Sequence, residues 1–200
     1  SCITPHTRAI VPMHYAGFAC DMDGIMQLAA RHDLAVIEDA AHAPDARHRE
    51  RPLGTIGDFG CFSFYSNKNI ACAEGGMLVT PHDDHAQRVR LLRSHGMTSL
   101  SHDRARGHAT AYDVVELGYN YRIDDIRAAL LLAQLRRLDE DIAWRARLRA
   151  RYEENLCGLN DIAVPFAERQ ERSSNYIFVV VLHEGGSERR ERVRHLLAAA

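Results

Sequence analysis

The chain has 200 residues, of which 46% are hydrophobic and 26% charged, and its formal net charge is −2 with histidine neutral. This length and composition fit one globular domain, or one and part of a second, and the hydrophobic share is too high for a disordered chain. Because the arginines are interleaved with acids, there is no electrostatic case for binding nucleic acid or an anionic membrane. No apolar run reaches the roughly 18 to 20 residues that cross a bilayer, so we expect no membrane span.

The cysteines and histidines give no sign of a disulfide framework or a metal site. The odd number of widely spaced cysteines, without a Cys-x-x-Cys pair, is typical of a reducing compartment, and we expect a cytoplasmic protein. His82 and His85 flank two aspartates but lack a third ligand at a suitable spacing. The solvated start of a helix accounts for them better, so we expect no metal.

The first predicted elements form a strand–helix–strand unit. Residues 9–13 are a short apolar strand, residues 21–23 supply N-cap candidates for a helix, and residues 34–37 are a second apolar strand. Near-continuous apolar strands of this kind are typical of a parallel sheet that is covered on both faces. Two more strands are expected at 59–64 and 77–80, followed by a helix at 83–94.

The second half of the chain is richer in helix. Residues 99–113 are polar and without periodicity, which predicts a surface loop. Apolar positions between 124 and 156 follow helical spacing, which predicts one very long helix, or two with a bend near 139–141, closed by Gly158. A strand is expected at 175–182 and an amphipathic helix from 187 to 200.

This order of elements predicts an α/β fold with a mainly parallel sheet, followed by part of a smaller α+β domain. We expect the boundary between residues 1–138 and 139–200. The first strand begins almost at residue 9, which leaves no room for earlier elements of the sheet.

Lysine occurs only once in the chain: of the 25 Lys+Arg residues, 24 are arginine and one is Lys68. Arginine can replace lysine on a solvated surface, but a guanidinium keeps its proton and cannot act as a nucleophilic amine. A single retained lysine is therefore a candidate for covalent amine chemistry, such as a Schiff base. The alternative is a surface lysine that persists by chance.

Other polar residues stand near the predicted strand ends. Asp39 directly follows an apolar strand, and a carboxylate at the C-terminal end of a parallel strand faces the crevice where α/β sheets bind ligands. A protonated ring nitrogen of a cofactor would suit it, and a helix N-cap or a turn is the alternative. His42 could reach the same ligand, although a lone histidine is usually a hydrogen-bonded loop residue. Ser63, in the strand before Lys68, offers a hydroxyl to a phosphate.

Several motifs occur in order along the chain, at residues 38–43 (EDAAHA), 57–64 (GDFGCFSF), 67–69 (NKN), 74–80 (EGGMLVT), 95–97 (HGM) and 118–122 (GYNYR). Together they closely resemble the DegT/StrS sugar aminotransferases, which are pyridoxal-phosphate enzymes with the aspartate-aminotransferase type of fold. The resemblance covers roughly residues 9–135 and continues to 182. Family members are about twice as long, so the chain is expected to be a fragment, with an incomplete large domain that lacks an upstream phosphate contact and ring-stacking aromatic residue.

The resemblance implies a role for five residues. Lys68 would form the internal aldimine with pyridoxal 5'-phosphate and carry the proton in transamination, while Asp39 would pair with the pyridine N–H. His42, where many relatives have glutamine, would contact the ring hydroxyl, and Ser63 would bind the phosphate. Asn120 would reach the phosphate site of a partner subunit, which implies a homodimer with shared active sites.

The reaction implied is transfer of an amino group from an amino acid, glutamate by analogy, to a keto group of a nucleotide-linked sugar. Relatives with histidine in place of the lysine act as sugar dehydratases, so Lys68 favours transamination. His14 matches a histidine of the family's first motif here but receives no role. Two alternatives stay open: an enzyme of the same fold with an amino-acid substrate, and a non-catalytic remnant that binds only a partner or a sugar nucleotide.

Overall fold

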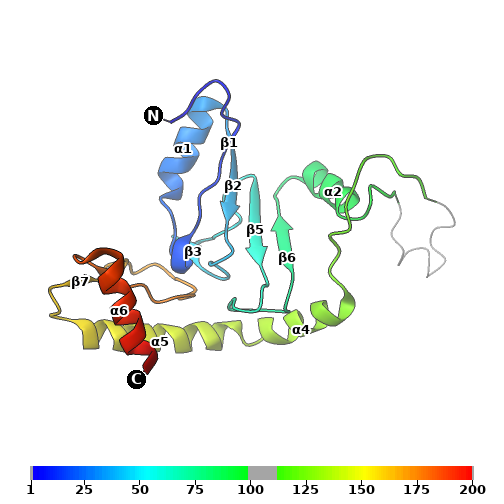
Figure 1. The fold of residues 1–200 in the computed structure, drawn as a ribbon. Helices are drawn as coiled ribbons and strands as arrows, with labels where there is room; N and C mark the ends of the chain where they lie inside the picture. The colour runs from blue at the N-terminus through cyan, green and yellow to red at the C-terminus, as the bar shows by residue number, and fades with distance from the viewer. Residues whose placement is uncertain (1, 99–111, 200) are drawn as a thin grey trace.

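The computed structural model describes residues 2–98 and 112–199, so most of the loop predicted at 99–113 lies outside the described residues. Its centre is a sheet with the strand order β1 (Ala9–Ile10), β2 (Ala35–Asp39), β5 (Phe59–Ser63) and β6 (Gly76–Val79) (Figure 1). β1, β2 and β5 are parallel, whereas β6 is antiparallel to β5. The predicted α/β fold with a mainly parallel sheet is therefore confirmed.

Helix α1 (Met22–His32) joins β1 to β2 and covers one face of the sheet. Asp21 caps its start by accepting a hydrogen bond from the Gly24 N–H at 3.1 Å, as its side chain predicts. Asp33 ends it in the left-handed conformation, with φ 53°. Small and aliphatic side chains fill the core between helix and sheet: Ala19, Met22, Ala29, Val36, Ala40, Ala43, Ala46, Leu53 and Ile56.

Beyond β6 the chain forms α2 (Asp83–Leu92), then α4 (Asp125–Leu135) and α5 (Leu138–Leu156), which run end to end along the lower ends of the strands (Figure 1). For residues 124–156, two helices with a bend was one of the two predicted alternatives. The break lies at Arg136 and Arg137, before the predicted bend at 139–141. Directly after the break, Leu138 and Ile142 of α5 are buried in a second core cluster with Phe64, Ile70 and Cys72.

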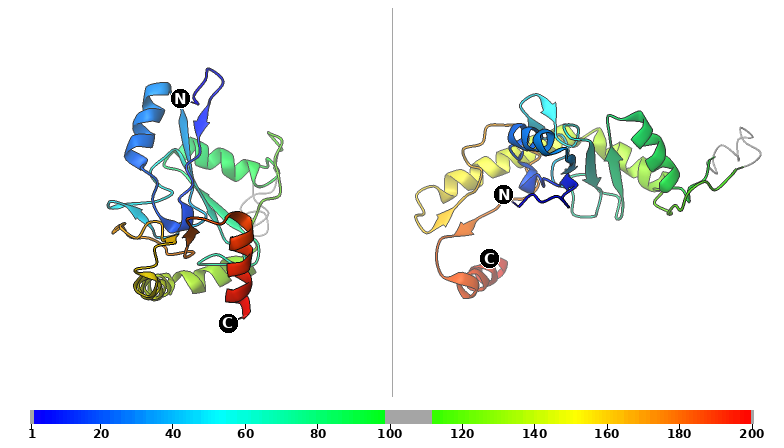
Figure 2. Two further views of the ribbon diagram at one scale, coloured as in Figure 1. Left: turned by 60° about the vertical axis from the view of Figure 1, so that its left-hand side comes forward. Right: turned by 90° about the horizontal axis from the view of Figure 1, so that it is seen from above.

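The rest of the chain contains little regular structure apart from a final helix. The structure contains two short antiparallel pairs whose pairing was not predicted: β3 (Arg47–His48) with β4 (Arg51–Pro52), and β7 (Ile162–Ala163) with β8 (Val181–Leu182). The strand predicted at 175–182 is wrong over most of its length, because only β8 finds a partner strand. Helix α6 (Gly186–Ala199) follows and lies away from the sheet (Figure 2).

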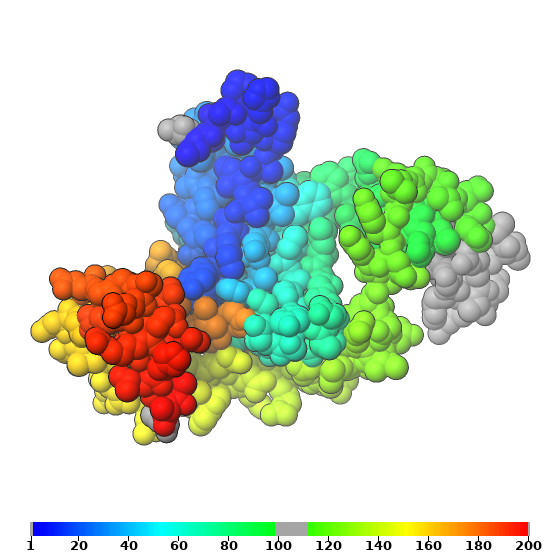
Figure 3. Space-filling view, in the orientation of Figure 1, coloured from blue at the N-terminus to red at the C-terminus, as the bar shows by residue number. Residues whose placement is uncertain are grey.

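The C-terminal part packs against the lower end of the N-terminal part (Figure 3). Backbone hydrogen bonds join the two: the Arg47 N–H donates to the Arg172 carbonyl at 2.8 Å, and the Tyr176 N–H donates to the Ala16 carbonyl at 3.2 Å. The C-terminal ends of β2 and β5 point toward this junction. Of the helices in the described residues, none has the length and apolar character that crossing a bilayer requires.

Candidate active site

Asp39, the last residue of β2, is held in place by its backbone. Its N–H donates to the Pro12 carbonyl at 2.8 Å, and its carbonyl accepts from the His14 N–H at 3.1 Å. One carboxylate oxygen accepts from the Ala41 N–H at 3.1 Å, which turns the chain toward His42. Among the contacts of the described residues, the other oxygen receives no protein hydrogen bond. The half-buried carboxylate therefore keeps an acceptor for a ligand.

Lys68 and His42 both contact one aromatic ring, that of Tyr176. Lys68 leaves β5 in a turn closed by its N–H on the Tyr65 carbonyl at 2.9 Å, and its Nζ lies 4.5 Å from the centroid of the Tyr176 ring. The imidazole of His42 lies 4.2 Å from the same ring, centroid to centroid. Two of the predicted residues are thus brought together by one that was not predicted.

The charges of Asp39 and Lys68 both act on His42. Burial lowers the pKa of His42, the positive charge of Lys68 lowers it further, and the carboxylate of Asp39 opposes them. The ring is therefore neutral at pH 7. Its Nδ1 lies 3.4 Å from the Ala16 N–H and accepts from it, which leaves the proton on Nε2. Asp39, His42 and Lys68 form one electrostatic cluster.

Ser63 shares a face of the sheet with Asp39. The register pairs Asp39 with Cys61, and Ser63 lies two residues further along β5, so the three side chains share a face. The Ser63 Oγ accepts from the Tyr65 N–H at 3.4 Å, and its hydroxyl proton remains available to a ligand. Burial, with the Asp39 carboxylate, raises the pKa of the Cys61 thiol and keeps it protonated.

Asn120 lies apart from the other four residues. Its backbone pairs with Ser94, directly after α2, and its side chain is exposed. The two motif segments around it pack closely, since a Cβ on Gly118 would lie 2.1 Å from the Gly96 nitrogen. No contact of the described residues joins Asn120 to Lys68 or Asp39 within one chain, and its predicted role rests on a partner subunit.

Behind Asp39 lies a buried pair, Glu38 and His14, that was not predicted. Glu38 accepts hydrogen bonds from the backbone N–H groups of Gly54, Ile56 and Gly57 at 2.6 to 2.8 Å, and from His14 Nε2 at 2.9 Å. Burial raises the pKa of Glu38, but these bonds outweigh burial and lower it below its ordinary value. A carboxylate beside Val36 and Ala40 on the buried face of a strand is the signal that could have found it.

His14 is the other half of that pair. Burial lowers its pKa, while contacts with Cys20 and Glu38 raise it, and the raising effects are larger. The Cys20 N–H donates to His14 Nδ1 at 3.2 Å, so Nδ1 carries a lone pair. The ring proton is therefore on Nε2, which faces Glu38. The pair is structural support directly beneath the Asp39 strand end.

A second feature that was not predicted is the segment 173–176. The Ser174 hydroxyl donates to the His42 carbonyl, and the Ser174 carbonyl accepts from Asn69 Nδ2 at 2.9 Å. Gly17 faces Ser174 with φ +94°, where a Cβ would lie 2.1 Å from the serine Oγ. The segment therefore links the loops that carry His42 and Lys68.

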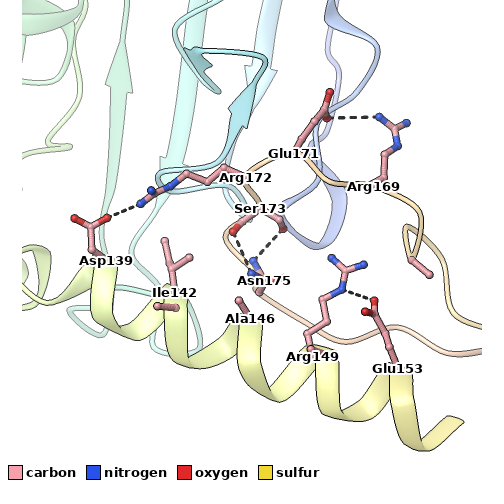
Figure 4. Close-up of a pocket in the computed structure, with 13 residues that line it drawn as sticks. Asp139, Ile142, Ala146, Arg149, Glu153, Arg169, Glu171, Arg172, Ser173 and Asn175 are labelled. Carbon is pink, nitrogen blue, oxygen red and sulfur yellow. Dashed lines mark hydrogen bonds and ion pairs between the residues drawn. The ribbon is translucent and has the colours of Figure 1, made fainter. Parts of the chain in front are cut away.

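A surface pocket of about 370 Å³ lies between α5 and residues 167–175 (Figure 4). None of the five predicted site residues lines it, and its arginines already face carboxylates, as in the pair of Arg149 with Glu153 at 2.7 Å. Neither do the described residues contain a group of three or more His, Cys, Asp or Glu that could hold a metal ion. The predicted site residues other than Asn120 lie instead at the C-terminal ends of β2 and β5 and in the loops that follow these strands.

The residues at the strand ends fit an aldehyde-bearing pyridine cofactor with a phosphate. Asp39 offers a carboxylate oxygen to a ring N–H, His42 a neutral donor, Ser63 a hydroxyl and Lys68 the amine. In addition, Asn69 Oδ1 is buried without a hydrogen-bond partner. Such an unpaired acceptor next to Lys68 is rare in a folded protein and suits a site that completes its bonds with a ligand.

Comparisons with known proteins agree with this chemistry. The model of the DegT/DnrJ/EryC1/StrS aminotransferase family matches residues 1–200. The spore coat polysaccharide biosynthesis protein SpsC of Bacillus subtilis is 39% identical over 183 residues, which are 91% of this chain and 47% of SpsC. The chain thus spans about half the length of this curated relative.

Solved structures give the same picture. DesV from S. venezuelae, in complex with a ketimine intermediate, superposes with a TM-score of 0.85 at 36% identity, covering 98% of this chain and 49% of DesV. The PLP-form of the putative sugar aminotransferase Spr1654 from Streptococcus pneumoniae has a TM-score of 0.85 at 27% identity, covering 98% and 53%.

Proposed function

This chain belongs to the DegT/DnrJ/EryC1/StrS aminotransferase family, and we propose that it acts in a pyridoxal-phosphate-dependent transfer of an amino group from an amino acid to a keto group of a nucleotide-linked sugar. The observation that carries this proposal is the position of the chain's only lysine, whose Nζ lies 4.5 Å from the centroid of the Tyr176 ring that the His42 imidazole also contacts. The family and the PLP-form of Spr1654 support the cofactor. Glutamate as the donor rests on family analogy.

Each side chain has a proposed task. When bound, pyridoxal phosphate supplies the electron sink of the reaction. The Lys68 amine would hold the cofactor, and when free it would move the proton at the reacting carbon. The Asp39 carboxylate would accept from a ring N–H, neutral His42 would donate to the ring hydroxyl, and the Ser63 hydroxyl would hold the phosphate.

Three wider features complete the proposal. We propose a homodimer in which Asn120 reaches the phosphate site of the partner subunit. We also propose that the boundary between the two domains lies between residues 138 and 139, in the first turn of α5 (Leu138–Leu156). The five free cysteines support a cytoplasmic location, because a reducing compartment keeps thiols unpaired.

The test uses the fact that only one lysine is available. The full chain is mixed with pyridoxal phosphate, reduced with borohydride and digested, and mass spectrometry locates the pyridoxyl group. We expect it on Lys68, with a visible absorption band before reduction that Lys68→Arg abolishes. Labelling of the N-terminal amine alone, or an unchanged band in Lys68→Arg, would contradict the proposal and favour a remnant that only binds.

A further inference from the structure

The Tyr176 ring is the one aromatic surface that faces both Lys68 and His42 among the described residues. Lys68 Nζ lies 4.5 Å from its centroid, within the range at which an ammonium is attracted to the face of an aromatic ring. The His42 ring, 4.2 Å away and tilted by 33°, restricts the tyrosine from another direction. A lysine side chain has four rotatable bonds, so this contact limits where its amine lies.

The backbone around Tyr176 is fixed from several sides. Its N–H donates to the Ala16 carbonyl at 3.2 Å, and its own carbonyl accepts from Arg145 Nη1, on α5, at 3.2 Å. Two residues earlier, Ser174 is fully buried and bonded to the His42 and Asn69 loops. The segment that carries the ring is therefore held by contacts with four other parts of the chain.

We propose that Tyr176 is a positioning residue for the reactive amine: its ring holds Lys68 Nζ beside His42 and Asp39, so that the segment 173–176 completes the site. This inference rests on the function proposed above. Tyr176 forms and breaks no bond in this assignment and acts through Lys68. Without the ring, the amine would spread over several rotamers, and misplacement by about 1 Å can slow a reaction on the order of 100-fold.

The first experiment needs no cofactor. Reductive methylation with ¹³C-formaldehyde gives one dimethyl-lysine NMR signal, which Lys68→Arg identifies by removing it. Because Lys68 lies over the ring face, the ring current shifts this signal upfield. We expect the shift to persist in Tyr176→Phe and to disappear in Tyr176→Leu. An unchanged position in Tyr176→Leu would overturn the proposed contact.

Tyr152→Leu is the matched control. Tyr152 stacks on Phe178, two residues beyond Tyr176, at 5.0 Å between ring centroids, so its loss perturbs the same segment without touching Lys68. The lysine signal should not move in this variant. If Tyr176→Leu does not fold, a nuclear Overhauser effect between the Lys68 N-methyl protons and the Tyr176 ring protons in the otherwise unaltered chain tests the same contact. Its absence would count against the proposal.

The second experiment measures how fast the chain attaches pyridoxal phosphate, from the growth of the visible band in a stopped-flow instrument. We expect Tyr176→Leu to slow attachment about 10-fold or more, with Tyr176→Phe and Tyr152→Leu close to the unaltered chain. Equal rates in all four proteins would refute a positioning role for Tyr176. If the unaltered chain forms no band, the proposed function fails, whereas the NMR shift still decides whether Tyr176 holds the amine.

Discussion

The Glu38 carboxylate and the His14 imidazole share a hydrogen bond of 2.9 Å, and both side chains are fully buried. With three backbone N–H groups from residues 54–57 also donating to it, Glu38 ties the end of β2 to the loop before β5. Asp39 follows in the chain, so the position of the proposed cofactor-binding carboxylate depends on the residue before it.

Glu38→Gln should be strongly destabilising. The amide keeps the size of the side chain but loses the charge, and its NH₂ group faces N–H donors where an oxygen accepted before. Leaving a buried donor unpaired costs about 1–3 kcal/mol, and more where the acceptor that is lost was charged. We expect the free energy of unfolding in urea to fall by about 3 kcal/mol. Glu50→Gln, at an exposed position, should leave it nearly unchanged, and equal effects of the two substitutions would contradict the role of Glu38.

The same carboxylate predicts a specific response to acid. The pKa of Glu38 is lower in the folded chain than its ordinary value of 4.5. A group of this kind stabilises the fold fully above pH 4.5, and its contribution is lost as the pH falls through the lower folded value. The stability difference between the unaltered chain and Glu38→Gln should therefore shrink between about pH 5 and pH 3. Urea titrations at these pH values measure it, and a constant difference would exclude an ionised Glu38.

Gly17→Ala should break the link between the His42 loop and Ser174. The backbone there has φ +94°, and a methyl group would lie 2.1 Å from Ser174 Oγ. Gly158 is the matched control: its φ is +87°, but nothing lies within 4 Å of a Cβ at that position. Gly158→Ala carries only the backbone strain, about 1–2 kcal/mol, and Gly17→Ala adds the clash. We expect Gly17→Ala to cost at least about 1 kcal/mol more in urea unfolding, and equal costs would show that Ser174 is not fixed there.

Arg149 should hold α5 to the N-terminal part. Its guanidinium lies 4.4 Å from the centroid of the Phe18 ring and donates to the Phe166 carbonyl and to Glu153, each at 2.7 Å. Arg149→Ala removes these bonds together with the packing of the side-chain stem, and we expect a loss of about 2 kcal/mol. Lysine at this position keeps the positive charge but lacks the planar guanidinium with its several N–H donors. Arg149→Lys should therefore recover only part of the stability that Arg149→Ala loses. Arg151→Ala, at an exposed position of the same helix, should change urea unfolding little.

The elements that the sequence predicted well are those set by local chemistry. The Asp21 cap and the apolar run after Leu34 are local signals, and both α1 and β2 form where they indicate. The strand expected at 175–182 fails because strand formation depends on a neighbouring strand, and among the described residues only Val181 and Leu182 pair with one. No nearby glycine or proline marks the break before Leu138, and Leu138 is buried in one cluster with Phe64 and Ile70, which are distant in the sequence.

In the candidate site, too, residues with a local chemical signal could be predicted, whereas a residue defined by distant contacts could not. Lys68 and Asp39 could be selected because a unique amine and a carboxylate at a strand end have chemical reasons to be there. Tyr176 could not, because its contacts with Lys68 and His42 join residues more than a hundred positions apart, and nothing in an apolar run marks one tyrosine as facing a lysine.

The last prediction concerns Asp39, whose carboxylate has one oxygen bonded to the Ala41 N–H and the other without a protein donor among the described residues. Asp39→Asn keeps the shape and the Ala41 bond but removes the negative charge that would keep a pyridine nitrogen protonated. Attachment of pyridoxal phosphate to Lys68 should survive, since the amine is untouched, while proton removal at the donor's α-carbon slows. The measurement is the single-turnover rate with glutamate, under conditions in which the unaltered chain is active. We expect this rate to fall on the order of 100-fold or more in Asp39→Asn. Borohydride trapping on Lys68 is the control for attachment. A variant that traps the cofactor normally and also reacts at the full rate would show that the Asp39 charge has no part in the reaction.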